Sequence, residues 1–101
     1  MTVMSDGAGP ARGARVVVKV GTSSITDEAG RIDPPRMGSI ARGVLLLERA
    51  TGRTPVLVSS GAGAAGRARL GLLLPLTLPD KQAAATVGQT LLMHDWERAF
   101  A

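Results

Sequence analysis

The sequence predicts an α/β fold built on a mostly parallel β-sheet. Runs of β-branched residues occur at 15–20 (RVVVKV) and 54–59 (TPVLVS), and a stretch with helical periodicity separates them. Two strands joined by a helix of this length form a βαβ unit with a right-handed crossover. A parallel sheet needs cover on both faces, which two strands and their helices do not complete. We therefore expect the first part of an α/β domain.

Composition limits the kinds of function that the chain can have. A length of 101 residues allows one domain with its own core, without a disulfide or metal staple. The absence of Cys excludes a zinc-thiolate site and a cysteine nucleophile, and the single histidine, His94, excludes a polyhistidine metal site. The net charge of +4 comes from arginines spread along the chain, and only two residues are aromatic. Nucleic-acid binding, which a cluster of cations would indicate, is therefore not expected.

Residues 1–14 are rich in Gly, Ala and Pro and lack the apolar core of a secretory signal. We interpret them as a flexible leader, followed by one domain over residues 15–101. The apolar run at 70–78 is too short to span a bilayer, and Pro75 interrupts it. We expect no membrane partner and a cytoplasmic location.

The first strand is expected to stop before Gly21, Thr22 and Ser23, and 26–30 (TDEAG) has the composition of a turn. Asp33 is the predicted N-cap of a helix, because two prolines suited to the first helical turn follow it. Gly52 is the predicted C-cap. One apolar stripe at helical spacing joins these ends: Met37, Ile40, Ala41, Val44 and Leu45.

After the second strand, 60–66 (SGAGAAG) predicts a loop that turns into a helix ending near Leu70. Two prolines make 70–79 an irregular crossing segment. Asp80 is the predicted N-cap of a long helix from Lys81 to the end of the chain. Its apolar positions are Val87, Leu91, Leu92, Trp96 and Phe100.

Both strands are followed by loops that could bind an anion. In open α/β sheets, ligands lie beyond the carboxyl ends of the strands. Glycines let the 60–66 backbone approach a ligand, and a helix N-terminus follows them. The alternative is a tight turn whose small residues only permit close packing, and the spacing matches neither the dinucleotide fingerprint nor the P-loop. Lys19 lies near the carboxyl end of the valine strand, where its ammonium could contact a phosphate or simply reach solvent.

Three blocks of sequence together resemble the amino-acid kinase family and, within it, the glutamate 5-kinases. The resemblance runs from residue 15 to residue 101. The blocks are 18–23 (VKVGTS), 58–66 (VSSGAGAAG) and 81–89 (KQAAATVGQ).

The resemblance implies a three-layer α/β/α sandwich, usually in homo-oligomers. It implies an enzyme that uses ATP and Mg²⁺ to phosphorylate the γ-carboxylate of L-glutamate, giving γ-glutamyl phosphate, the first step of proline biosynthesis. Lys19 then contacts the ATP phosphates as the catalytic cation, with Gly21 and Thr22 beside them. The glutamate-binding residues are Ser60, Gly61 and Ala62, and no metal ligand is assigned. Such roles suit phosphoryl transfer, in which catalysis is mainly positioning and charge stabilisation.

The family's signature positions in the last helix, Lys81, Gln82, Gly88 and Gln89, are interpreted as structural, because small residues there let a helix pack closely. Gln89 could alternatively support the substrate loop.

The chain departs from the family in what it lacks. It contains no Asn, and the family's catalytic aspartate and second phosphate-binding lysine have no counterpart. We therefore expect the front part of a truncated kinase domain that is inactive alone. Two alternatives stay open: a non-catalytic chain that binds nucleotide or glutamate, and another family member, namely a carbamate, acetylglutamate, aspartate or uridylate kinase.

Overall fold

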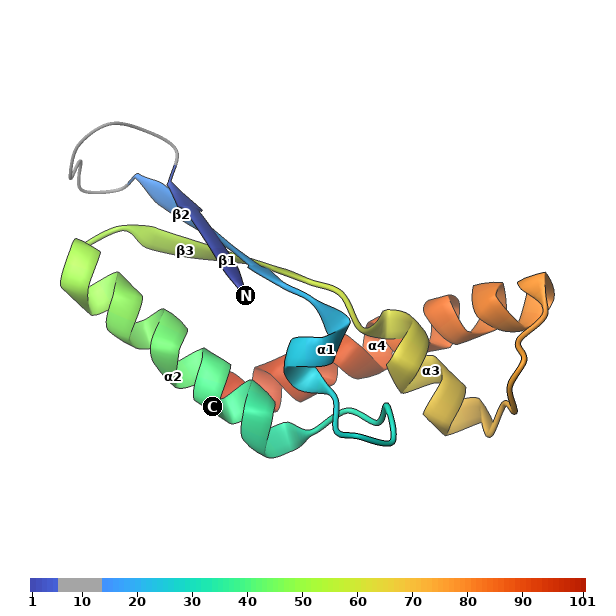
Figure 1. Ribbon diagram of the computed structural model, residues 1–101. Coiled ribbons are helices and arrows are strands. Elements are labelled where there is room, and N and C mark those ends of the chain that lie inside the picture. The colour runs from blue at the N-terminus through green and yellow to red at the C-terminus, as the bar shows by residue number, and fades with distance from the viewer. Residues whose placement is uncertain (6–13) are drawn as a thin grey trace.

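The computed structural model describes residues 1–5 and 14–101. In this part of the chain, a mixed sheet of three strands packs against helices (Figure 1). The strands are β1 (Thr2–Ser5), β2 (Arg15–Val20) and β3 (Thr54–Ser59), in the order β1-β2-β3. The α/β class predicted from the sequence is confirmed.

The βαβ unit forms as predicted. Strands β2 and β3 pair in parallel, with Val17 opposite Val56 and Val20 opposite Ser59, and α2 (Pro34–Thr51) connects them. The side chain of Asp33 accepts a hydrogen bond from the backbone N–H of Arg36, and Gly52 ends the helix at a φ of 67°. Both caps are those that the sequence predicts, because each end carries a residue whose chemistry suits only that end.

Strand β1 lies within residues 1–14, which their composition predicts to be a flexible leader. Residues Thr2–Ser5 pair with β2 in antiparallel orientation, with Val3 opposite Val18. The Gly, Ala and Pro that suggest a leader are concentrated in residues 7–14. Residues 2–5 precede them and are able to pair with a valine-rich strand. The expectation for residues 6–13 lies outside the described residues.

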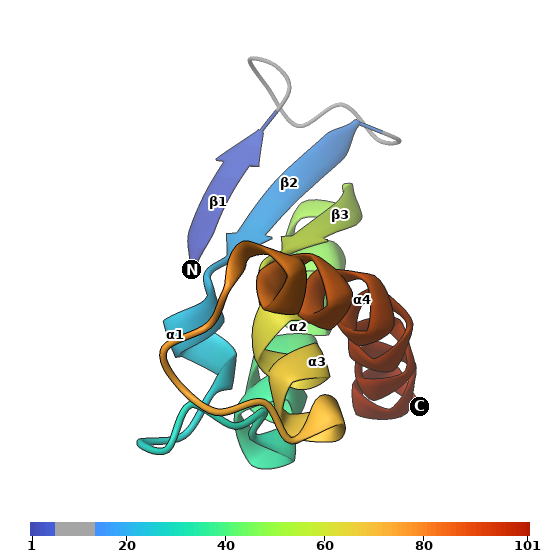
Figure 2. The ribbon, with the colours of Figure 1, turned by 90° about the vertical axis from the view of Figure 1, so that its right-hand side faces the viewer.

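The described helices lie on one face of the sheet (Figures 1 and 2). Along β2, Val16, Val18 and Val20 are buried under α2 and α4, whereas Lys19 points to the opposite face and is exposed. On that opposite face, Val56 and Val58 of β3 are 38% and 49% exposed. The described residues thus form two of the three layers that the resemblance implies.

Three helices complete the described fold: α1 (Thr22–Ile25), α3 (Ala62–Leu70) and α4 (Leu78–Phe100). Sequence reasoning missed α1, a single turn with no apolar periodicity of its own. No helix in residues 14–101 is long and apolar enough to cross a membrane.

Helix α4 begins three residues earlier than predicted. The N-cap is Thr77, not Asp80: Asp80 is at the third helical position, and both halves of a capping box are formed between the two residues. Pro79 lies within the first turn, where a missing N–H costs nothing.

Candidate functional site

The two loops singled out in the sequence lie side by side at one edge of the sheet. Because β2 and β3 are parallel and in register, their carboxyl ends coincide, with Val20 opposite Ser59. The backbone N–H of Ser60 donates to the carbonyl of Val20 over 2.8 Å, which joins the first residue after β3 to the end of β2. The predicted juxtaposition of the Lys19 and Ser60 loops is therefore present.

The first loop leaves open space beside its backbone. Gly21 is extended, at φ −79° and ψ 159°, and no atom of the described residues lies within 4 Å of a Cβ added to it. Thr22, the next residue, is exposed, and its carbonyl accepts a hydrogen bond from Oγ1 of Thr26 over 2.9 Å. A ligand can thus approach the Gly21 backbone, which is the arrangement expected of a phosphate-contacting glycine.

The second loop packs against buried side chains of the core at Gly61. Gly61 is buried and has a φ of 117°, a conformation that L side chains rarely adopt. A Cβ added to it would lie 2.8 Å from Cδ1 of Ile25 and 3.6 Å from Cδ1 of Leu92, both in fully buried side chains. Ser60, the residue before Gly61, is exposed. Its carbonyl accepts a hydrogen bond from Oγ of Ser59 over 2.8 Å.

The N-terminus of α3 carries positive charge at this edge. The first helical hydrogen bond runs from the N–H of Ala65 to the carbonyl of Gly61 over 3.0 Å, so the N–H groups of residues 62–64 have no acceptor inside the helix. Gly61 provides no side-chain cap, and the first turn has no acidic residue. These groups favour an anionic ligand. The exposed Lys19 side chain lies at the same end of β2 but on the opposite face of the sheet.

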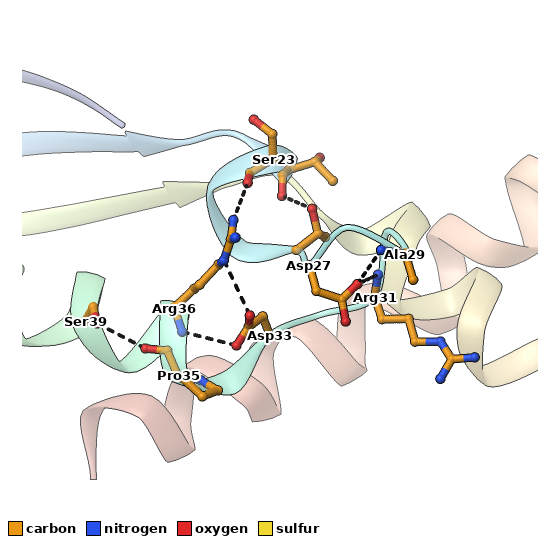
Figure 3. A network of polar contacts seen from close by, with 10 residues as sticks. Ser23, Asp27, Ala29, Arg31, Asp33, Pro35, Arg36 and Ser39 are labelled. Atoms are coloured by element: carbon orange, nitrogen blue, oxygen red, sulfur yellow. Dashed lines mark hydrogen bonds and ion pairs between the residues drawn. The ribbon is translucent and has the colours of Figure 1, made fainter.

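A polar network fixes the turn beneath α1 (Figure 3). One carboxylate oxygen of Asp27 accepts from the N–H groups of Ala29 and Arg31 over 2.9 and 3.0 Å. Arg36 pairs with Asp33 over 3.4 Å and donates to the carbonyl of Ser23 over 3.5 Å, which ties the start of α2 to α1. Sequence reasoning missed Arg36, because no local pattern distinguishes it from the exposed arginines elsewhere.

This edge does not fit a Mg²⁺ ion held by the protein. Magnesium in kinase sites is bound by one or two carboxylates together with substrate phosphates. The side chains here are those of Lys19, Thr22 and Ser60, and the described residues form no group of three or more His, Cys, Asp or Glu that could hold a metal.

The comparisons with known proteins give the chain a family. Residues 14–101 match the model of the amino acid kinase family. The chain is 50% identical over 88 residues to a glutamate 5-kinase of Pelobacter propionicus and 54% identical over 88 residues to one of Thermus thermophilus. It is 51% identical over 90 residues to a glutamate 5-kinase of Corynebacterium efficiens.

Each of these alignments covers 86% of this chain but only 23% or 24% of the relative. The chain thus spans about a quarter of the length of the curated relatives that it matches. The match includes both strands of the parallel pair, the two loops at their carboxyl ends and the whole of α4. On this evidence the chain belongs to the amino acid kinase family.

Proposed function

We propose that this chain is the part of a glutamate 5-kinase that contacts the ATP phosphates and the glutamate substrate. The observation that carries the proposal is the convergence of the Lys19 and Ser60 loops at the carboxyl edge of β2 and β3. The relatives named above are glutamate 5-kinases, and they match this chain through both loops. ATP and L-glutamate are the proposed substrates, and the proposed location is the cytoplasm.

The proposed phosphoryl transfer requires mainly positioning and charge stabilisation from these residues. In the reaction, a γ-carboxylate oxygen of glutamate attacks the γ-phosphorus of ATP, and the bond from that phosphorus to the bridging oxygen breaks as ADP leaves. The attacking carboxylate is already ionised, so no strong base is needed. Lys19 would stabilise charge on the phosphate oxygens, with the backbone at Gly21 and Thr22 alongside. Mg²⁺ would arrive with the phosphates.

The second loop would hold the glutamate. We assign a hydrogen bond from the Ser60 hydroxyl, and backbone contacts from Gly61 and Ala62, to the substrate. The partial positive charge at the start of α3 suits a carboxylate. In this assignment, the glutamate substrate would bind at the loop after β3 and the ATP phosphates at the loop after β2. The two loops are neighbours at one edge of the sheet.

Calorimetric titration with ATP–Mg²⁺ and with L-glutamate tests the proposal. Lys19→Ala is expected to weaken ATP binding at least tenfold and glutamate binding little, and Ser60→Ala is expected to do the reverse. Arg49→Ala, which removes one exposed cation at the far end of α2, is the control for net charge. Equal loss of ATP binding in Lys19→Ala and Arg49→Ala would contradict the assignment of Lys19.

The second candidate is binding of these ligands without turnover, because these 101 residues offer no counterpart of the catalytic aspartate and second phosphate-binding lysine that the family resemblance implies. Trapping of γ-glutamyl phosphate with hydroxylamine separates the two. We expect no product from the 101-residue chain above a Lys19→Ala control. Competition by carbamate, N-acetylglutamate, aspartate or UMP at equal concentration would point instead to another kinase of the family.

A further inference from the structure

The long helix α4 has one buried face, and that face runs beneath the proposed glutamate loop. Its fully covered residues are four apart, so they form a single stripe: Ala84, Gly88, Leu92 and Trp96. Gly88 belongs to the KQAAATVGQ block, which the proposed chemistry leaves without a role. Ala84 and Gly88 pack against α3, whereas Leu92 and Trp96 continue the stripe into the core beneath the sheet. The α3–α4 contact is the most extensive between two elements of the described chain.

The two helices touch through their backbones. A Cβ added to Gly88 would overlap the carbonyl oxygen of Ala62 and lie 2.7 Å from the backbone nitrogen of Gly66. A Cβ added to Gly66 would in turn overlap the carbonyl oxygen of Ala84. Only two residues without side chains permit this separation, because the atoms that would be struck are backbone and cannot rotate away.

One turn further along α4, the contact reaches the loop itself. Cδ1 of Leu92 lies 3.6 Å from the position of an added Gly61 Cβ. Successive turns of α4 therefore meet Gly66, Ala62 and Gly61 in order. The contact between α3 and α4 thus extends to Gly61 and Ala62, the residues at the start of α3.

We infer that Gly66 and Gly88 are positioning residues for the anion-binding donors of the second loop. They touch no ligand; they fix the separation of α3 from α4, and through it the placement of the Gly61 and Ala62 N–H groups. The identity of the ligand, glutamate, rests on the proposed function, whereas the control of the loop by α4 does not. Displacing a substrate contact by about 1 Å can cost on the order of a hundredfold in rate.

The test compares three variants of the full chain. Gly88→Ala adds a methyl group at the crossing. Gly43→Ala adds the same group on the exposed face of α2, away from both loops, where no atom lies within 4 Å. Val44→Ala removes a buried contact of α2 away from the crossing, and so lowers stability without touching the loop. L-glutamate affinity and the ¹⁵N–¹H chemical shifts of Ser60, Gly61 and Ala62 are measured for each.

We expect Gly88→Ala to shift all three amides and to weaken glutamate binding at least tenfold. Gly43→Ala and Val44→Ala should leave the affinity within about twofold of the unmodified chain. Unshifted loop amides in a folded Gly88→Ala variant would overturn the inference, as would an equal loss of affinity in Val44→Ala. If the unmodified chain does not bind glutamate, the proposed function fails, and the amide shifts alone still decide the role of Gly88.

Hydrogen exchange on the unmodified chain decides the case in which Gly88→Ala does not fold. If α4 holds α3 in place, the amides of Ala65 and Gly66 and those of residues 84–92 exchange through one common opening, with the same dependence on denaturant. Protection of the α3 amides that survives the opening of α4 would overturn the inference.

Discussion

At the scale of single residues, the geometry of Gly61 is compatible with both interpretations of the glycine loop that the sequence left open. The glycine loop could be an anion site or a tight packed turn, and Gly61 meets the geometric needs of both. Its φ of 117° turns the chain into α3, and its missing side chain makes room for Ile25. Glycine content alone predicted the loop, but the contact with Ile25 comes from α1, which has no sequence signal.

Gly61→Ala is expected to lower the free energy of unfolding by about 2–4 kcal/mol. A left-handed conformation costs an L residue about 1–2 kcal/mol, and the new methyl group meets the buried Ile25 side chain. Urea denaturation measures the change. Gly63→Ala is the matched control, because it lies in open space on α3 and gains helix propensity. Equal destabilisation of both variants would contradict this account.

Trp96 is buried under the sheet, and within the described residues its indole N–H has no hydrogen-bond partner. An unpaired buried donor costs about 1–3 kcal/mol. Trp96→Phe removes both the donor and some of the packed volume, so we expect a net change within about 1 kcal/mol in urea denaturation. Trp96→Ala, which leaves a cavity, should cost about 3–5 kcal/mol. A large loss in Trp96→Phe would show that the indole N–H is paired in solution.

At the scale of elements, the sequence predicts a helix end well where one residue is a clear cap. It predicts the end less well where two nearby residues could both act as the cap. Asp33 and Gly52 bound α2 as expected. At the start of α4, Thr77 and Asp80 are both good N-caps, and Pro79 between them suggested that the helix began after it. The capping box forms between Thr77 and Asp80, with Pro79 between them in the first turn, so Thr77 is the N-cap.

Thr77→Ala should lower the free energy of unfolding by about 1 kcal/mol, since it removes the acceptor for the Asp80 N–H. Thr86→Ala is the control on the same helix. Its hydroxyl donates to the carbonyl of Gln82 in mid-helix, where alanine is the better helix former. Thermal or urea unfolding of the two variants should move in opposite directions, and a cost for Thr86→Ala equal to that for Thr77→Ala would refute the capping role.

At the scale of the whole molecule, the βαβ unit and the meeting of its two loops were predictable, because strand direction follows from a single crossover helix. Strand β1 was not, since its four residues gain their structure from pairing with β2. The one-sided sheet was not predicted either. The alternating burial along β2 places the core on one face, and the third layer, over Val56 and Val58, stays a prediction.

Matched substitutions on the two faces test where the core lies. Val18 is fully buried on the helix-covered face, whereas Val58 lies on the opposite face and is 49% exposed. Threonine replaces a methyl group by a hydroxyl in both cases. Val18→Thr should cost about 1–3 kcal/mol, because the hydroxyl is buried without a partner, and Val58→Thr should change the free energy of unfolding by about 0.5 kcal/mol or less. A large cost for Val58→Thr in the 101-residue chain would mean that this face is covered in solution, by a second copy if the cost rises with protein concentration.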